Sequence, residues 1–280
     1  MPDSTPVIVS DGWLHEQAER LVAVPGVLGV LLGGSRARGE HTPESDVDLG
    51  LYYRGPLDVD ALGALARDVA GPTAHVTAVG EWGPWVDGGG WLQADGVPVD
   101  WLYRDLNRVE TCWADAQRGR YRFHAHVGHP LGVPDFAYAG EVALGVVLAD
   151  PTGQLGQLHE ATSAYPAALA EALVRGLWEA RFLIDVAHKA VGRGDAAYVA
   201  GCLFRALGLC AHALHGRAGR WLLNEKGAIA SAGRLAGTPE GFAERAQALF
   251  GTLGSSPEEL AASLDRAVAL VDETVAACAG

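Results

Sequence analysis

The sequence predicts an α+β protein made of a mixed α/β domain over residues 1–150 and an α-helical bundle over residues 151–280. In the first half, segments with the helical period alternate with segments typical of strands. In the second half, alanine and leucine prevail and apolar residues recur at the spacing of amphipathic helices. The length of 280 residues also suits two domains better than one.

The first half is expected to contain two helices, two single strands and a hairpin. The first helix covers residues 12–24, with Asp11 as its N-cap and the pair Pro25-Gly26 at its end. The remaining segments are strands over residues 27–34 and 46–53, a helix over residues 58–70 and a hairpin over residues 91–103 that turns at Asp95-Gly96.

The second half is expected to be a bundle of four or five helices. Gly, Pro and Ser residues separate the periodic apolar segments and mark the helix ends. Residues 135–149 fit either domain, so the boundary is placed just after them, near Asp150-Pro151. The helices are expected over residues 165–191, 196–216, 238–253 and 256–279.

Composition and charge limit the partners that the chain can have. Hydrophobic residues make up 49% and charged residues 20%, as in a globular protein. The formal net charge of -13 repels a phosphate backbone, so we expect a small cationic substrate and no long nucleic acid. The N-terminus lacks a signal-peptide pattern, and the longest apolar runs are shorter than the ~20 residues of a membrane span. We therefore expect a cytoplasmic protein without a membrane partner, and a homodimer is left open.

Residues 31–53 carry the strongest chemical signal in the sequence. The turn GGS, residues 33–35, follows an apolar strand and opens a short helical segment, where glycines let backbone amides approach an anion. Asp46 and Asp48 are two residues apart on the next strand, so their carboxylates point to one face, where Mg²⁺ offsets their repulsion. The segment predicts an anion cradle beside a metal anchor, as a nucleoside triphosphate with bound Mg²⁺ requires.

Other phosphate and metal motifs fit this segment less well. A Walker loop needs a lysine that is missing here, and GGSRARG does not supply the dinucleotide fingerprint GxGxxG. An EF-hand loop that began at Asp46 would need glycine at its sixth position, where Leu51 stands. The remaining alternative is a loop and a strand with exposed carboxylates, which the ordered set of GGS, Arg38 and SDVD disfavours.

At these residues the sequence resembles the nucleotidyltransferase superfamily related to DNA polymerase beta. The pattern of that superfamily is a strand, G-[GS], a short helix and [DE]-x-[DE] on the next strand, and the matching residues here are GGSRARG followed by SDVDL. The resemblance implies that Asp46 and Asp48 bind two Mg²⁺ ions. It also implies that Gly34, Ser35 and Arg38 contact the triphosphate of ATP, and that a third carboxylate lies on a later strand.

Asp100 is the expected third carboxylate. It interrupts the apolar run GVPVDWLY after the predicted hairpin turn, where an isolated aspartate needs a partner such as a shared metal. The alternative is a carboxylate that faces water on an edge strand, as Pro98 suggests. Asp100 is expected to ligate metal, to act as general base toward an acceptor hydroxyl, or both. Glu141 and Glu179 are rivals for the role of base.

Lys226 and the tryptophans are further candidates. Lys226 resembles a position at which related two-domain enzymes bring a lysine to the triphosphate, and a plain surface lysine is the alternative. Most tryptophans are expected in the core, but one or two that line a cleft would stack on a base or a sugar ring. The tryptophans concentrated in the first half include Trp82, Trp85, Trp91, Trp101 and Trp113.

The motif, the helical second half and the length together resemble the aminoglycoside nucleotidyltransferases. The resemblance implies transfer of AMP from ATP to a hydroxyl of a small cationic acceptor, with release of pyrophosphate. Two alternatives stay open: a lincosamide-type nucleotidyltransferase, and an MNT/HEPN-like toxin-antitoxin nucleotidyltransferase that modifies a protein partner. The second alternative rests on Arg181 and His188, which match the R-x(4-6)-H pattern of HEPN helices and can share a helix face.

Overall fold

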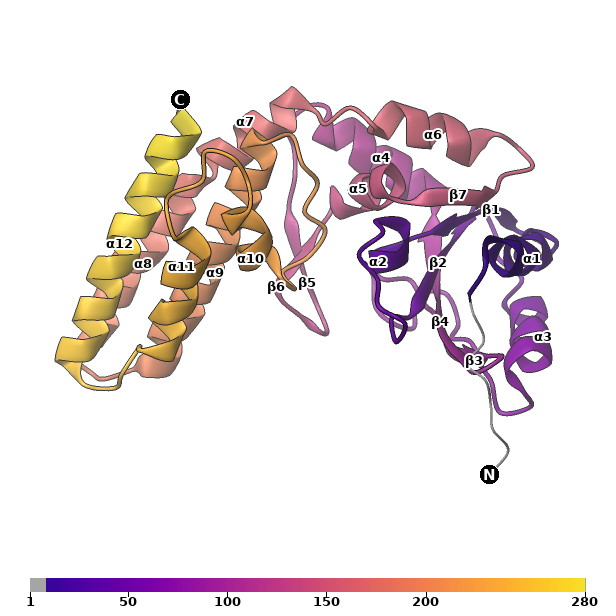
Figure 1. Cartoon of the computed structure of the whole chain (residues 1–280), viewed down its shortest axis with the longest axis horizontal. Coiled ribbons are helices and arrows are strands. Elements are labelled where there is room, and N and C mark those ends of the chain that lie inside the picture. The colour runs from indigo at the N-terminus through magenta and orange to yellow at the C-terminus, as the bar shows by residue number, and fades with distance from the viewer. Residues whose placement is uncertain (1–8, 280) are drawn as a thin grey trace. The chain divides into compact units, whose positions relative to one another are not determined.

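The computed structural model describes residues 9–279, which form two compact units (Figure 1). The sheet unit contains residues 9–114 and 138–164, and the helical unit contains residues 115–137 and 165–279. The α+β class predicted from the sequence is confirmed. The division differs from the predicted boundary at residues 150 and 151, because the chain leaves the sheet unit for one hairpin and then returns to it.

The sheet unit is built on a five-stranded mixed sheet with the order β3-β4-β2-β1-β7. β1 is antiparallel to both β2 and β7, β2 is parallel to β4, and β3 is antiparallel to β4. The predicted hairpin is confirmed, and its turn residues Asp95 and Gly96 have φ angles of +53° and +80°. The strands are β1 (Val27–Leu32), β2 (Val47–Tyr53), β3 (Gly89–Ala94), β4 (Val97–Asp105) and β7 (Val146–Ala149).

Helices cover both faces of this sheet (Figure 1). One face packs its apolar side chains against α1 and α3, and the other packs Leu31 and Tyr52 against α4, α5 and α6. The first helix is capped by Ser10, whose hydroxyl accepts from the N–H of Trp13, and not by Asp11 as expected. The helices are α1 (Asp11–Val22), α2 (Gly34–Ala37), α3 (Val59–Ala70), α4 (Leu106–Ala116), α5 (Ala137–Leu144) and α6 (Gln154–Thr162).

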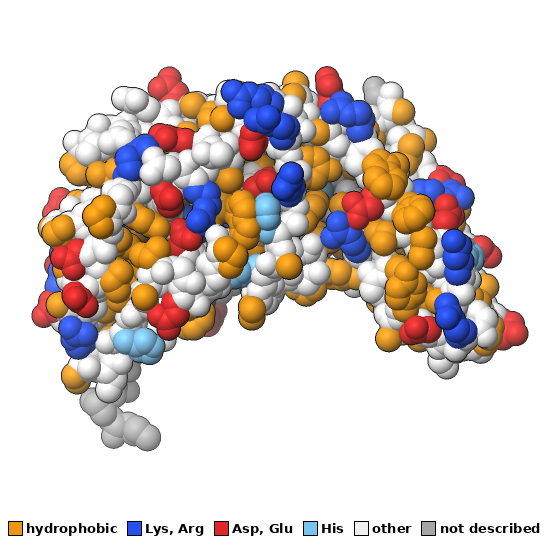
Figure 2. Space-filling model, turned by 180° about the vertical axis from the view of Figure 1, so that it is seen from behind, with side chains coloured by type: hydrophobic (Ala, Val, Ile, Leu, Met, Phe, Trp, Pro, Cys, Tyr) orange, Lys and Arg blue, Asp and Glu red, His pale blue; other side chains and the backbone are white. Residues whose placement is uncertain are grey.

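Charged side chains of both signs are mixed on the surface. On the face shown in Figure 2, Lys and Arg side chains are scattered among Asp and Glu.

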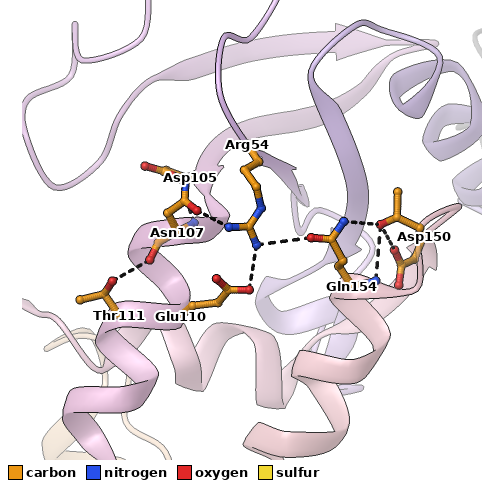
Figure 3. A network of polar contacts seen from close by, with 8 residues as sticks. Arg54, Asp105, Asn107, Glu110, Thr111, Asp150 and Gln154 are labelled. Atoms are coloured by element: carbon orange, nitrogen blue, oxygen red, sulfur yellow. Dashed lines mark hydrogen bonds and ion pairs between the residues drawn. The ribbon is translucent and has the colours of Figure 1, made fainter.

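A polar network fixes the far end of β2 (Figure 3). Arg54 follows β2 directly, and its guanidinium donates to Asn107 and Glu110 of α4 and to Gln154 of α6. The distances to the Glu110 and Gln154 oxygens are 2.8 and 3.3 Å. Because one guanidinium serves two helices, the network holds α4 and α6 at the end of β2 opposite to Asp48.

The helical unit combines six helices with a short hairpin. The single helix expected over residues 165–191 is two helices, because Gly176, a poor helix former, ends α7 and precedes α8. A Cβ at Gly176 would lie 2.5 Å from the hydroxyl of Tyr121, so this position also lets Tyr121 pack closely. The described elements are β5 (Phe123–His126), β6 (His129–Pro134), α7 (Ala167–Arg175), α8 (Leu177–Val191), α9 (Ala196–Arg217), α10 (Ala228–Gly233), α11 (Phe242–Gly251) and α12 (Pro257–Ala279).

α9 is the central helix of the helical unit. It is the one helix in residues 9–279 that is long and apolar enough to cross a membrane, with a mean hydropathy of 1.5. However, 67% of its apolar window is buried inside the protein. This burial is the arrangement of a core helix, whose apolar surface is already covered by its neighbours.

Candidate active site

The turn after β1 seats the carboxylate of Asp48. The N–H of Gly33 donates to the carbonyl oxygen of Asp48 at 2.8 Å, which ties the turn to β2. Gly34 has a φ of +63°, and a Cβ at this position would lie 1.7 Å from Oδ2 of Asp48. Only glycine combines this backbone conformation with such a close approach, so Gly34 determines where the acid lies. Ser35 follows in α2 and is half-buried.

Asp48 and Asp100 lie side by side on the sheet. The register of the parallel strands β2 and β4 pairs these two residues directly. Side chains at paired positions of neighbouring strands point to the same face, so the two carboxylates are neighbours. Asp46 immediately precedes β2 and is exposed. The structure thus sets Asp48 and Asp100 side by side and Asp46 near enough for its charge to raise the pKa of both, and their catalytic roles stay a prediction.

Pro98 does not make β4 an edge strand. β4 lies between β3 and β2, and its pairing with β2 begins only at Val99. Pro98 pairs with Gln93 of β3 alone, so its missing N–H removes no hydrogen bond from the ladder with β2. Asp100 therefore belongs to a central strand and is half-buried, which differs from the alternative of a water-facing carboxylate on an edge.

Burial and mutual repulsion disfavour the charged forms of two of these acids. Burial, followed by the charges of Glu141 and Asp46, raises the pKa of Asp48, and Arg38 and Arg104 offset part of this effect. Burial, followed by the charges of Asp48 and Asp46, raises the pKa of Asp100 to about 6. Such crowding of carboxylates is unfavourable without a cation and is typical of functional sites.

The donor set fits a hard divalent cation. Asp46, Asp48 and Asp100 offer only carboxylate oxygens, which Mg²⁺ prefers over nitrogen or sulfur. Across residues 9–279, no three His, Cys, Asp or Glu side chains already converge as a ready-made metal site. A bound cation would therefore draw the three carboxylates toward a common point, and the exposed Asp46 has the most freedom to turn.

Two arginines near the turn have different partners. Arg36 donates from Nε and a terminal nitrogen to the carbonyl oxygens of Ser45 and Asp46, and it thereby holds the segment that leads into β2. Arg38 forms an exposed ion pair with Glu40, at 2.9 Å, and its charge lowers the pKa of Asp48. Arg38 is therefore the freer of the two to exchange its partner for an incoming anion.

Sequence reasoning missed Arg104, whose positive charge offsets part of the rise in the pKa of Asp48. Its guanidinium forms two hydrogen bonds with Glu141 of α5, at 2.5 and 2.8 Å, and it is only 7% exposed. This engagement makes Glu141 a structural partner of Arg104 as well as a rival base. The signal was available in the sequence, because Arg104 stands four residues after Asp100 and shares its face of the strand.

The remaining predicted residues lie in the helical unit. Lys226 is exposed in the turn before α10, where its N–H donates to Oδ1 of Asn224 at 2.9 Å. A contact between Lys226 and a triphosphate stays a prediction. Glu179 forms an ion pair with Arg205 at 2.6 Å, so its carboxylate already has a cationic partner.

The pair that suggests a HEPN helix also has other partners. Arg181 donates to both carboxylate oxygens of Asp272 on α12, at 2.6 and 2.8 Å. His188 lies 3.9 Å from Asp265 of the same helix. Both residues thus connect α8 to α12, which accounts for their spacing without a nuclease role.

Comparison with known proteins supports the interpretation of the turn and the first two acids. Residues 14–75 match the model of the nucleotidyltransferase domain family, and this stretch contains Gly34, Ser35, Asp46 and Asp48 but ends before Asp100. The comparison with curated proteins gave no match. A solved structure of a nucleotidyltransferase-like protein from Exiguobacterium sibiricum is similar over 93% of this chain and 74% of its own, with 14% identity and a TM-score of 0.45. The chain therefore carries a nucleotidyltransferase domain, and it is an enzyme of the transferase class.

Proposed function

We propose that the protein transfers AMP from ATP to a hydroxyl of a small cationic acceptor, in a reaction that depends on Mg²⁺. The acceptor class proposed is the aminoglycosides. The observation that carries the proposal is the direct pairing of Asp48 with Asp100 on parallel strands, beside the turn that Gly34 forms. This arrangement offers acids for a metal and a glycine turn for phosphate on one face of the sheet.

Each residue has a distinct role in the proposed reaction. Asp46, Asp48 and Asp100 would hold two Mg²⁺ ions, which when bound stabilise negative charge on the reacting phosphate. Gly34, Ser35 and Arg38 bind the triphosphate, and Lys226 is proposed as a further triphosphate contact.

The proposed transfer forms one bond to phosphorus, breaks another and moves one proton. The acceptor oxygen forms a bond to the α-phosphorus, and the bond from that phosphorus to the pyrophosphate oxygen breaks. The hydroxyl proton passes to Asp100, whose carboxylate lies beside Asp48 on the same face of the sheet.

The charge of the protein supports a cationic acceptor. The formal net charge of -13 attracts protonated amines and repels nucleic acids. The proposed reaction uses ATP and Mg²⁺, both abundant in the cytoplasm, where we place the protein.

Release of pyrophosphate from ATP and Mg²⁺ tests the proposal when it is measured across a panel of aminoglycosides, lincosamides and candidate proteins. We expect turnover with at least one aminoglycoside, and Asp48→Asn should lower kcat on the order of 10³-fold while the protein stays folded. Asp265→Asn, which neutralises an exposed acid on α12, is the matched control and should leave kcat unchanged. No turnover with any acceptor, together with no Mg²⁺-dependent ATP binding, would contradict the proposal.

A further inference from the structure

A stacked pair of tryptophans lies on the exposed part of the sheet. The rings of Trp82 and Trp91 have centroids 4.5 Å apart and planes inclined by 22°. Trp91 is 72% exposed, although it lies within strand β3 and not in a loop. The neighbours Leu92 and Ala94 are buried in the core, so the pattern of the strand leaves Trp91 on the opposite face.

The pair adjoins the acids of the candidate active site. The antiparallel register of β3 and β4 places Trp91 directly opposite Asp100, so their Cβ atoms are about 5 Å apart on the same face. Trp82 lies over Gly89, since a Cβ at Gly89 would be 3.1 Å from Cζ3 of Trp82. The two tryptophan rings therefore lie directly next to the carboxylates of the candidate active site.

The fold does not require tryptophan at this position. A large indole ring left in water on an edge strand contributes little to the core, and polar residues are the usual choice there. Within residues 9–279, the cation–π contacts involve other rings, and neither Trp82 nor Trp91 has an arginine or lysine over its face. The exposed face of this pair is thus available to a ligand.

We propose that Trp82 and Trp91 form the acceptor subsite, and that its occupant is a sugar ring that carries a protonated amine. This inference rests on the proposed function and names the part of the site that selects the acceptor. An indole face attracts both the C–H groups of a sugar and a nearby cation. The formal net charge of -13 adds a general attraction for the protonated amine.

The order of residues across the sheet places this subsite on the acceptor side. The turn at Gly34 lies against β2, Asp48 is on β2, Asp100 is on β4 and Trp91 is on β3. Trp91 is thus two strand spacings, or ~10 Å, from Asp48 and farthest from the phosphate turn. A sugar ring on the tryptophans would present its hydroxyl toward Asp100, while the triphosphate occupies the other side.

Fluorine NMR of the intact protein labelled with 5-fluorotryptophan tests binding without any turnover. Trp82→Phe and Trp91→Phe variants identify the two resonances, and the probes are kanamycin, glucose and ATP with Mg²⁺. We expect kanamycin to shift both resonances with saturation, in the wild type and in Asp48→Asn, and glucose at equal concentration to leave them unchanged. The proposal is overturned if kanamycin leaves both resonances unchanged, or if ATP with Mg²⁺ shifts them instead.

Steady-state kinetics give the second readout, with an acceptor that is turned over. Trp91→Ala should raise the KM for the acceptor about tenfold and leave the KM for ATP unchanged. The KM of Trp91→Phe for the acceptor should lie between those of the wild type and Trp91→Ala. Trp178→Ala, which removes a tryptophan of similar exposure (68%) on α8, is the matched control. Turnover that is insensitive to Trp91→Ala would refute the subsite and leave the proposed function standing. Binding of kanamycin by NMR without turnover of any acceptor would support the subsite and contradict the proposed function.

Discussion

The two units of the protein differ in how particular titratable groups away from bulk water are compensated. In the sheet unit Arg104 and Glu141 form an ion pair, and the half-buried acids Asp48 and Asp100 are crowded together, which raises the pKa of both. In the helical unit His212 is fully buried, and burial lowers its pKa to about 3, so it is neutral. Its ring nitrogens have no hydrogen-bond partner among the described residues. Crowded carboxylates are typical of functional sites, whereas a neutral ring surrounded by apolar side chains is typical of a core.

The largest expected effect concerns the turn that positions the crowded acids. Gly34→Ala should lower kcat/KM at least ~100-fold, because the added methyl group would lie 1.7 Å from Oδ2 of Asp48 and must displace that carboxylate. The assay is pyrophosphate release with the best acceptor from the panel, and circular dichroism checks the fold.

Gly39→Ala is the control for backbone strain in this experiment. Gly39 has a similar φ of +68°, but nothing lies within 4 Å of its Cβ position. Its substitution should therefore cost about 1 kcal/mol of stability and leave kcat/KM unchanged. Equal loss of activity in both variants would show that strain, and not the position of Asp48, explains the result.

The next effect tests the paired charges in the sheet unit. Arg104→Met should lower the free energy of unfolding by about 3 kcal/mol, because it leaves the half-buried Glu141 without its partner and close to Asp48. Urea denaturation measures this change. The double variant Arg104→Met/Glu141→Leu should recover most of the loss, since no unpaired charge remains. A single variant as stable as the wild type would mean that the pair is not held in a buried, charged form.

The smallest effect tests the neutral group in the helical unit through pH. The pKa of His212 is about 3 in the folded protein and 6.5 when unfolded, so between these values the unfolded chain binds the extra proton. Stability is thus present above pH 6.5 and is lost as the pH falls, by about 2 kcal/mol at pH 5. His212→Leu should remove this part of the acid sensitivity in urea denaturation at pH 7.5 and 5. Identical pH dependence in both proteins would show that His212 is hydrated or paired.

Local patterns allowed much of this protein to be predicted. The hairpin at Asp95-Gly96 and the two strands around the acids follow from turn chemistry and alternation, which act over a few residues. The long helix over residues 165–191 was wrong, because apolar periodicity continues across Gly176 and hides the break. The predicted boundary at residues 150 and 151 also differs from the observed division, because local patterns do not show which segments pack together. Residues 123–134 show no local sign that they belong with the later helices.

The sequence by itself determined which chemical groups the protein has: a glycine turn, two acids at strand spacing, a third acid further along the chain and an acidic net charge. Only the tertiary structure decided which of these groups meet. The parallel register sets Asp100 beside Asp48, and the antiparallel register sets Trp91 beside Asp100. Strand order and register depend on how whole layers bury their apolar faces, so they cannot be read from any one segment.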